Sequence, residues 1–241
     1  MTLAGKRIVV TRPRELAQGL AALIRQAGGE PLLFPAIEIR DPEDAGPALA
    51  LLGRLQEFDL AVFVSPSAVR KALELAAGRA WPRVAAVGTG TRQELEQRGF
   101  RNVLAPAGQA DSEALLALPE LAQVAGIRVL ILRGAGGREL LGETLAARGA
   151  KVDYAQCYRR VRPEVRPLEG RIDALCVGSG EALTNLAALL GRERLEHAPV
   201  FVSHLRVAAQ AADLGLQRPV LAGPGDAEML AALVAYFGAA K

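Results

Sequence analysis

The feature that most constrains the fold is a succession of short apolar runs, each followed by a helix-like pattern. The runs span residues 6–10, 59–65, 83–88, 128–133, 173–178 and 199–203. The helical patterns that follow them span residues 15–27, 66–77, 90–98, 137–148, 180–190 and 204–213. The runs do not alternate with polar residues, which indicates strands buried on both faces. The sequence therefore predicts an α/β protein with parallel sheets covered by helices.

The chain also resembles itself. The matching segments are AGKRIVV (4–10) with AGIRVLI (125–131), DLAVFVSPSA (59–68) with DALCVGSGEA (173–182), and GQADSEALLAL (108–118) with GPGDAEMLAAL (223–233). Two copies of one unit predict two similar lobes of the flavodoxin or Rossmann type, with a cleft between them. The stretches 34–44 and 154–167 look extended and contain proline, so they are candidate linkers. The repeat alone leaves open whether each lobe is contiguous in sequence.

Composition narrows the class of protein. Apolar residues make up 51% of the chain, but no run approaches the ~20 residues that a bilayer span needs. The first residues lack the pattern of a signal peptide, so we expect a cytoplasmic protein. A net charge of +3 suits an anionic partner, whereas scattered arginines and 4% aromatic residues argue against nucleic acid. Cys157 and Cys176 are expected to be packing residues, and with only His197 and His204 besides, a metal site is not expected.

Small hydroxyl residues, glycine and arginine follow most of the expected strands. The residues concerned are Thr11, Arg12, Ser65, Ser67, Thr89, Thr91, Arg133, Ser179, Ser203 and Arg206. Because parallel strands end at the same edge of a sheet, these side chains and the helix N-termini beside them predict an anion-binding edge. Helix capping is the alternative for every hydroxyl. Ser67 is predicted to be an N-cap, and Asp111 or Ser112 is predicted to begin a helix with support from Glu113.

The segment ILRGAGGREL (131–140) has the order strand, glycine-rich turn, helix. The sequence GxxxxGK[ST] is absent, and the glycines do not fit GxGxxG in register, so a nucleotide site is not supported. There is also no GxSxG or HExxH. We therefore expect Arg133 and the amides of Gly134 to Gly137 to face carboxylates, with Arg138 on the outer face of the helix.

Taken together, the segments resemble the uroporphyrinogen-III synthase family, in its proteobacterial form. The matching pieces are VTRP, FVSPSAV, AVGTGT, DSEALLALPEL, LILRGAGGRELLGETLAARGA followed by Tyr158, GSGEAL and FVSHLRVAAQAADLG. The resemblance implies two α/β lobes joined by a two-stranded linker. One lobe would be discontinuous, residues 1–37 with 163–241, the other would be residues 42–155, and the linker strands would be 34–41 and 156–162.

The resemblance also implies a reaction in haem biosynthesis. Members of the family are lyases that convert hydroxymethylbilane, a linear tetrapyrrole, to cyclic uroporphyrinogen III with loss of water and inversion of the last pyrrole ring. No cofactor and no metal would be used. Favouring one ring closure over the spontaneous one is mainly a matter of positioning, with some stabilisation of positive charge. We expect a monomer that contacts the preceding enzyme of the pathway transiently, without nucleic acid or membrane.

The resemblance assigns roles to individual residues. Tyr158 matches a tyrosine implicated in the departure of the hydroxyl group, with packing at the junction of the lobes as the alternative. Thr91 matches a substrate-cleft threonine. The remaining expected substrate-binding residues are Thr11, Arg12, Ser65, Ser67, Thr89, Arg133, Gly134, Gly136, Ser179, Ser203 and Arg206.

The turn SHLRV (203–207) departs from the Gly-x-Thr-Thr-like form of many members, which leaves a hydroxyl-specific role there in doubt. His204 is expected on the surface. The rival function is a non-catalytic two-lobed binder of a small polyanionic ligand. A nucleotide-dependent enzyme is disfavoured by the missing phosphate motifs.

Overall fold

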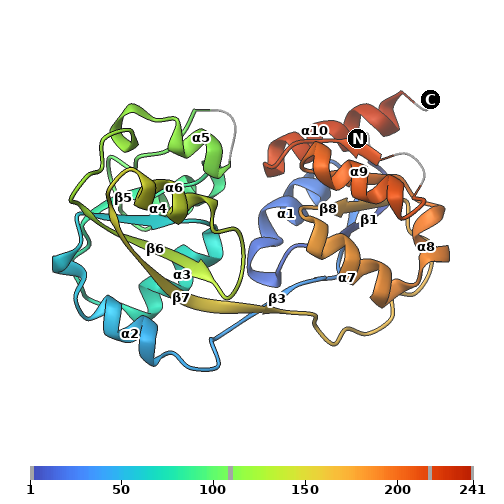
Figure 1. Ribbon diagram of the computed structural model, residues 1–241. Coiled ribbons are helices and arrows are strands. Elements are labelled where there is room, and N and C mark those ends of the chain that lie inside the picture. The colour runs from blue at the N-terminus through green and yellow to red at the C-terminus, as the bar shows by residue number, and fades with distance from the viewer. Residues whose placement is uncertain (1–2, 108–110, 217–218, 240–241) are drawn as a thin grey trace. The chain divides into compact units, whose positions relative to one another are not determined.

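The computed structural model describes residues 3–107, 111–216 and 219–239. The chain divides into two compact units, and Figure 1 shows a sheet with helices in each. Unit 1 comprises Met1–Glu38 and Val161–Lys241, and unit 2 comprises Ile39–Arg160. No helix in the described part of the chain is long and apolar enough to cross a bilayer.

Unit 1 contains a five-stranded sheet in the order β10-β9-β8-β1-β2. Its strands are β1 (Arg7–Val10), β2 (Glu30–Leu33), β8 (Ala174–Val177), β9 (Val200–Val202) and β10 (Pro219–Leu221), and every neighbouring pair is parallel. Its helices are η1 (Arg14–Leu16), α1 (Gln18–Gln26), α7 (Gly180–Leu190), α8 (Arg192–Glu196), α9 (Leu205–Asp213) and α10 (Asp226–Gly238).

Unit 2 contains a five-stranded sheet in the order β3-β7-β6-β4-β5. Its strands are β3 (Glu38–Arg40), β4 (Leu60–Phe63), β5 (Arg83–Ala86), β6 (Arg128–Gly134) and β7 (Lys151–Val161). Its helices are α2 (Gly46–Leu52), η2 (Leu55–Glu57), α3 (Pro66–Leu75), α4 (Thr89–Gln97), α5 (Ser112–Leu116), η3 (Pro119–Leu121) and α6 (Leu140–Ala147).

The two sheets share one plan. Strands β2-β1-β8-β9-β10 of unit 1 correspond to β7-β6-β4-β5 of unit 2, followed by a parallel bridge between Ala85 and Leu104 where unit 1 has β10. Along the chain, unit 1 has the flavodoxin-like order 2-1-3-4-5, whereas in unit 2 the equivalents of β8 and β9, namely β4 and β5, precede those of β1 and β2, namely β6 and β7. The expected linker segments supply β3 and β7, which lie side by side at the edge of the second sheet (Figure 1).

The continuous apolar runs are buried on both faces, as the sequence predicts. All four residues of β4 are buried, and so are all four of β8. Within unit 2, Phe63 and Leu130 belong to one hydrophobic cluster, while Val62 and Ile131 belong to another. Because successive residues of a strand point to opposite faces, the helices on each side of the sheet cover their own core.

Most predicted elements are confirmed, with shifted ends. The helix expected at 137–148 begins only at Leu140, because Gly136 and Gly137 have φ angles of 69° and 108°, which a helix cannot contain. The helix expected at 15–27 is divided into η1 and α1. The short strands β2 and β10 lay outside the expected units.

Both cysteines are unpaired and buried, as predicted. Burial raises the pKa of each thiol to about 12, so both are protonated at neutral pH. Across the described ranges, no group of three or more His, Cys, Asp or Glu side chains is arranged to hold a metal ion. His197 and His204 are both exposed, and His204 has the surface position expected of it.

Candidate functional site

Each sheet has a switch point, where the strand order reverses and ligands of open α/β sheets bind. In unit 1 it lies between the carboxyl ends of β1 and β8, and in unit 2 between those of β6 and β4. The predicted residues at these ends are Thr11 and Arg12 after β1, Ser179 after β8, Arg133 and Gly134 at the end of β6, and Ser65 after β4. The topology therefore brings each unit's strand-end residues to the edge where a ligand is expected.

In unit 2, Ser65 and Tyr158 form a hydroxyl pair. The Tyr158 oxygen lies 3.0 Å from the Ser65 oxygen, and either can be the donor. Ser65 also caps α3, accepting a hydrogen bond of 3.1 Å from the amide of Ala68. Tyr158 is 2% exposed and packs in the hydrophobic core of unit 2, so the serine lies at the tyrosine's polar end. The two residues come from β7 and the β4–α3 turn, which are distant in sequence.

The prediction that Ser67 is an N-cap is wrong. Helix α3 begins at Pro66, the first residue of the expected range 66–77, where the fixed φ and missing N–H of proline are well tolerated. Ser65 is the cap, and Ser67 lies inside the helix with 6% of its surface exposed. At α5 the prediction succeeds, since Asp111 accepts a hydrogen bond of 2.8 Å from the amide of Ala114.

Gly134 is needed for the close approach of the Tyr158 ring. A Cβ at this position would lie 2.6 Å from the nearest ring carbon. The register between β6 and β7 shifts between Arg133 and Gly134, and the amide of Ala135 donates to the Tyr158 carbonyl at 2.7 Å. The glycine and this irregularity together seat the tyrosine beside the loop.

Arg133 is buried and engaged by the loop that follows β6. It is 5% exposed, its Nε donates to the Gly136 carbonyl at 3.1 Å, and its Nη2 donates to the same oxygen. Its Nη1 donates to Glu139 at 2.9 Å. A buried guanidinium needs such partners, and the loop supplies them before any ligand arrives. Without a ligand, Arg133 thus has a role inside the loop, and its contact with a substrate carboxylate stays a prediction.

Arg138 is exposed and pairs with Glu113, but it precedes α6 and does not lie on the outer face of that helix as expected. Gly136 is exposed, and its carbonyl is the one held by Arg133. At the next turn, Gly88 caps α4, Thr89 is exposed at the first helical residue, and Thr91 is 4% exposed. Thr89 is therefore open to solvent, whereas Thr91 packs within unit 2.

In unit 1, two of the expected hydroxyls already have acceptors. Thr11 donates to the carbonyl of Cys176 at 2.7 Å, and Ser203 donates to the carbonyl of Gly178 at 2.7 Å. They are 0% and 5% exposed respectively. These bonds tie neighbouring strand ends together. Ser179 caps α7 through the Ala182 amide at 3.1 Å and is partly exposed.

The two predicted site arginines of unit 1 differ in availability. Arg12 forms an ion pair with Asp226 and donates to the carbonyl of Pro224 at 2.7 Å. Arg206 is exposed on the first turn of α9, and in the described ranges its side chain has no hydrogen bond or ion pair. Sequence reasoning did not identify Asp226 or Glu139 as acceptors, because the arginine–carboxylate pairing appears only in three dimensions.

A family model described as "Uroporphyrinogen-III synthase HemD" matches residues 18–231. The chain is 37% identical over 240 residues to the uroporphyrinogen-III synthase of Escherichia coli (strain K12), covering 92% of this chain and 97% of that protein. It is 36% identical over 239 residues to the Salmonella typhimurium synthase, with the same coverage.

Solved structures agree in fold. Uroporphyrinogen-III synthetase from Helicobacter pylori 26695 superposes with a TM-score of 0.65 at 15% identity, covering 96% of this chain and 99% of that one. A mutant uroporphyrinogen III synthase from Thermus thermophilus gives 0.63 at 20% identity, covering 98% and 100%. At these identities the superpositions support the fold alone, and the sequence matches show the family. The chain belongs to the uroporphyrinogen-III synthase family.

Proposed function

We propose that this protein cyclises hydroxymethylbilane to uroporphyrinogen III, with loss of water and inversion of the last pyrrole ring. The observation that carries the proposal is the match to the Escherichia coli synthase over 97% of that protein's length. The family model, over residues 18–231, includes the strand ends of both units apart from that of β1. We also propose that the enzyme acts as a monomer and contacts the preceding enzyme of the pathway transiently.

The substrate carries acetate and propionate groups, so binding requires hydrogen-bond donors. Among the predicted strand-end residues and the loop after β6, the amides of Gly136 and Gly137 and the guanidinium of Arg206 have no protein acceptor in the described ranges. Ser65, Thr89 and Ser179 are partly or fully exposed and add hydroxyl groups. The proposed binding set therefore consists mainly of neutral donors, with Arg206 as its unpaired charge.

The chemical step begins when the terminal hydroxyl of hydroxymethylbilane takes a proton and its C–O bond breaks. This releases water and leaves an electrophilic azafulvene, which the far pyrrole attacks. We assign the proton to the Tyr158–Ser65 pair: Ser65 donates to the leaving oxygen while the buried Tyr158 hydroxyl, 3.0 Å away, donates to Ser65. The far pyrrole attacks through its already substituted carbon, and the resulting spiro intermediate fragments and recloses with that ring inverted. The free α-carbon of the inverted ring then loses a proton as the ring regains aromaticity, and this proton returns to the pair, so the net reaction loses water only.

The test is an assay with freshly made hydroxymethylbilane, followed by oxidation and separation of the porphyrin isomers. The spontaneous reaction gives the uninverted isomer I. The proposal predicts that the protein raises the proportion of isomer III in the product above that of the enzyme-free control. A mixture with the isomer ratio of the enzyme-free control would contradict it. Sedimentation velocity at assay concentration tests the proposed monomer, and a dimer mass would contradict that part alone.

A further inference from the structure

The guanidinium of Arg133 is at the centre of a compact cluster in unit 2. Three of its nitrogens are engaged, two by the Gly136 carbonyl and one by Glu139. Its flat face lies over the ring of Tyr154, with 5.1 Å between the guanidinium carbon and the ring centroid. The Arg133 side chain is only 7% exposed, while that of Glu139 is 52% exposed. The cluster thus extends from the interior of the unit to its surface.

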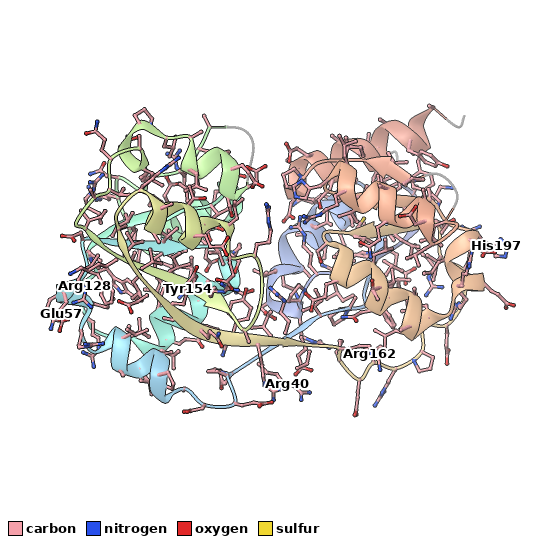
Figure 2. The ribbon with its side chains drawn as sticks, viewed as in Figure 1. Arg40, Glu57, Arg128, Tyr154, Arg162 and His197 are labelled. Atoms are coloured by element: carbon pink, nitrogen blue, oxygen red, sulfur yellow. The ribbon has the colours of Figure 1, made fainter. Side chains whose placement is uncertain are left out.

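Tyr154 completes the cluster from the neighbouring strand β7 (Figure 2). Its hydroxyl lies so close to the backbone of α6 that a Cβ at Gly142 would be 1.8 Å from the oxygen. The Tyr154 hydroxyl and then Arg133 lower the pKa of Glu139. Burial, followed by the Glu139 carboxylate, raises the pKa of Tyr154. At neutral pH the carboxylate is therefore charged and the phenol is protonated.

The cluster controls the direction of one peptide group. The Gly136 carbonyl and the Gly137 N–H belong to the same planar trans peptide, so they point in opposite directions. Because Arg133 holds the carbonyl oxygen on its own side, the Gly137 N–H points away from Arg133. Gly136 and Gly137 both have positive φ, the conformation that makes this turn possible. In the described part of the chain, neither amide donates to a protein acceptor.

We propose that Arg133, Glu139 and Tyr154 are positioning residues that fix the Gly136–Gly137 peptide for binding a substrate carboxylate. The inference rests on the proposed function and assigns the three side chains no contact with substrate. Glu139 balances the charge of Arg133, so the cluster contributes orientation and little attraction. If the loop samples other shapes, the apparent dissociation constant rises by the reciprocal of the fraction in the competent shape.

Glu139→Gln distinguishes positioning from charge attraction by the sign of its effect. Removing a negative charge near a site for a polycarboxylate lowers KM if electrostatic attraction dominates. If Glu139 acts through Arg133, the same substitution loosens the loop, and we expect KM to rise about three- to tenfold with kcat within about twofold. The matched control is Glu143→Gln on the same helix. Glu143 is exposed and forms no ion pair in the described ranges, so the KM of Glu143→Gln should equal the wild-type value or be slightly lower.

A second readout does not depend on turnover. With ¹⁵N-labelled glycine, we expect the amide signals of Gly136 and Gly137 to shift or broaden in Glu139→Gln and in Arg133→Lys, which keeps the charge but loses the planar fork. The signal of Gly126 should stay unchanged. Unchanged Gly136 and Gly137 signals, or a lower KM in Glu139→Gln, would overturn the inference. Failure of the wild-type protein to enrich isomer III would refute the proposed function instead, and the amide signals would still decide whether the cluster holds the loop.

Discussion

The two units use the same strand-end arginine in different ways. In unit 2, Arg133 holds the carbonyl and the carboxylate of the loop that immediately follows it. In unit 1, Arg12 holds Pro224 and Asp226, at the start of the last helix of the chain. Each arginine joins a central strand to the N-terminal end of a helix. The arginine that recurs in the repeat therefore has a shared structural role. In unit 2 it contacts the loop next to it in sequence, and in unit 1 it connects the N-terminal and C-terminal parts of the chain.

A second difference concerns the serine caps. Ser65 and Ser179 cap equivalent helices with equal distances of 3.1 Å to the amide three residues on. Only Ser65 has a tyrosine beside it, because the position of Tyr158 is taken by buried Ile37 in the other copy of the repeat. If the proton transfer requires both hydroxyls, the chemistry belongs to unit 2 and unit 1 contributes binding.

The largest effect is expected for Tyr158→Phe. Loss of the phenolic hydroxyl removes the proposed proton donor while keeping the ring that packs against Gly134. We expect kcat to fall about 100-fold, within the usual contribution of general acid catalysis. Tyr236→Phe in α10 of unit 1 is the control and should retain kcat. The measurement is the initial rate of isomer III formation at saturating substrate, and an unchanged rate in Tyr158→Phe would remove the acid role.

Gly134→Ala tests the close approach that unit 2 requires. The new Cβ would meet the Tyr158 ring at 2.6 Å, and overpacking of this kind costs about 1–3 kcal/mol of unfolding free energy. The control is Gly178→Ala, after β8 in unit 1. A Cβ at this position would have no atom within 4 Å, so the substitution should change the free energy of unfolding by less than about 0.5 kcal/mol. Chemical denaturation of both variants provides the measurement. Equal stabilities would show that the tyrosine ring moves aside freely.

Arg206→Ala tests whether Arg206 binds the substrate. We expect KM to rise about three- to tenfold at low salt, with kcat nearly unchanged, because a charge that attracts the polyacid is lost. The difference should shrink as salt is added, since exposed charges are screened. The control is Arg25→Ala, which should leave KM unchanged. Arg25 is exposed in the last turn of α1, at the opposite end of that helix from the strand ends where the ligand is expected. A loss confined to kcat would contradict a binding role.

The smallest effect is a pH dependence of stability. The pKa of Glu139 is lowered in the folded protein, so its charged form is favoured by folding. Its stabilising contribution is present above the ordinary pKa of 4.5 and is lost as pH falls through the lowered folded value. The stability difference between the wild-type protein and Glu139→Gln should therefore disappear below that range. A difference that persists at low pH would show that the charge of Glu139 is not responsible.

Sequence patterns predicted the strands well because continuous Val, Ile and Leu runs report burial directly. They missed β2 because its sequence, EPLL, contains a charge and a proline and is only partly buried. They identified serines at helix starts, but not that Thr11 and Ser203 donate their protons to neighbouring strand ends. They also predicted that Arg133 contacts a substrate carboxylate, but not that Glu139 accepts a hydrogen bond from it. A linear pattern does not contain distances across the fold, and these distances decide which carboxylate pairs with an arginine, as the Arg12–Asp226 pair shows.

The comparison of Ser65→Ala with Ser179→Ala tests the division of roles between the units most directly. Each substitution removes an N-cap and should cost about 1 kcal/mol of stability. Only Ser65→Ala also separates Tyr158 from its hydroxyl partner. Measured at saturating hydroxymethylbilane with the fold intact, kcat should fall at least about tenfold in Ser65→Ala and remain near the wild-type value in Ser179→Ala. Equal kcat values in the two variants would contradict the assignment of the proton transfer to unit 2.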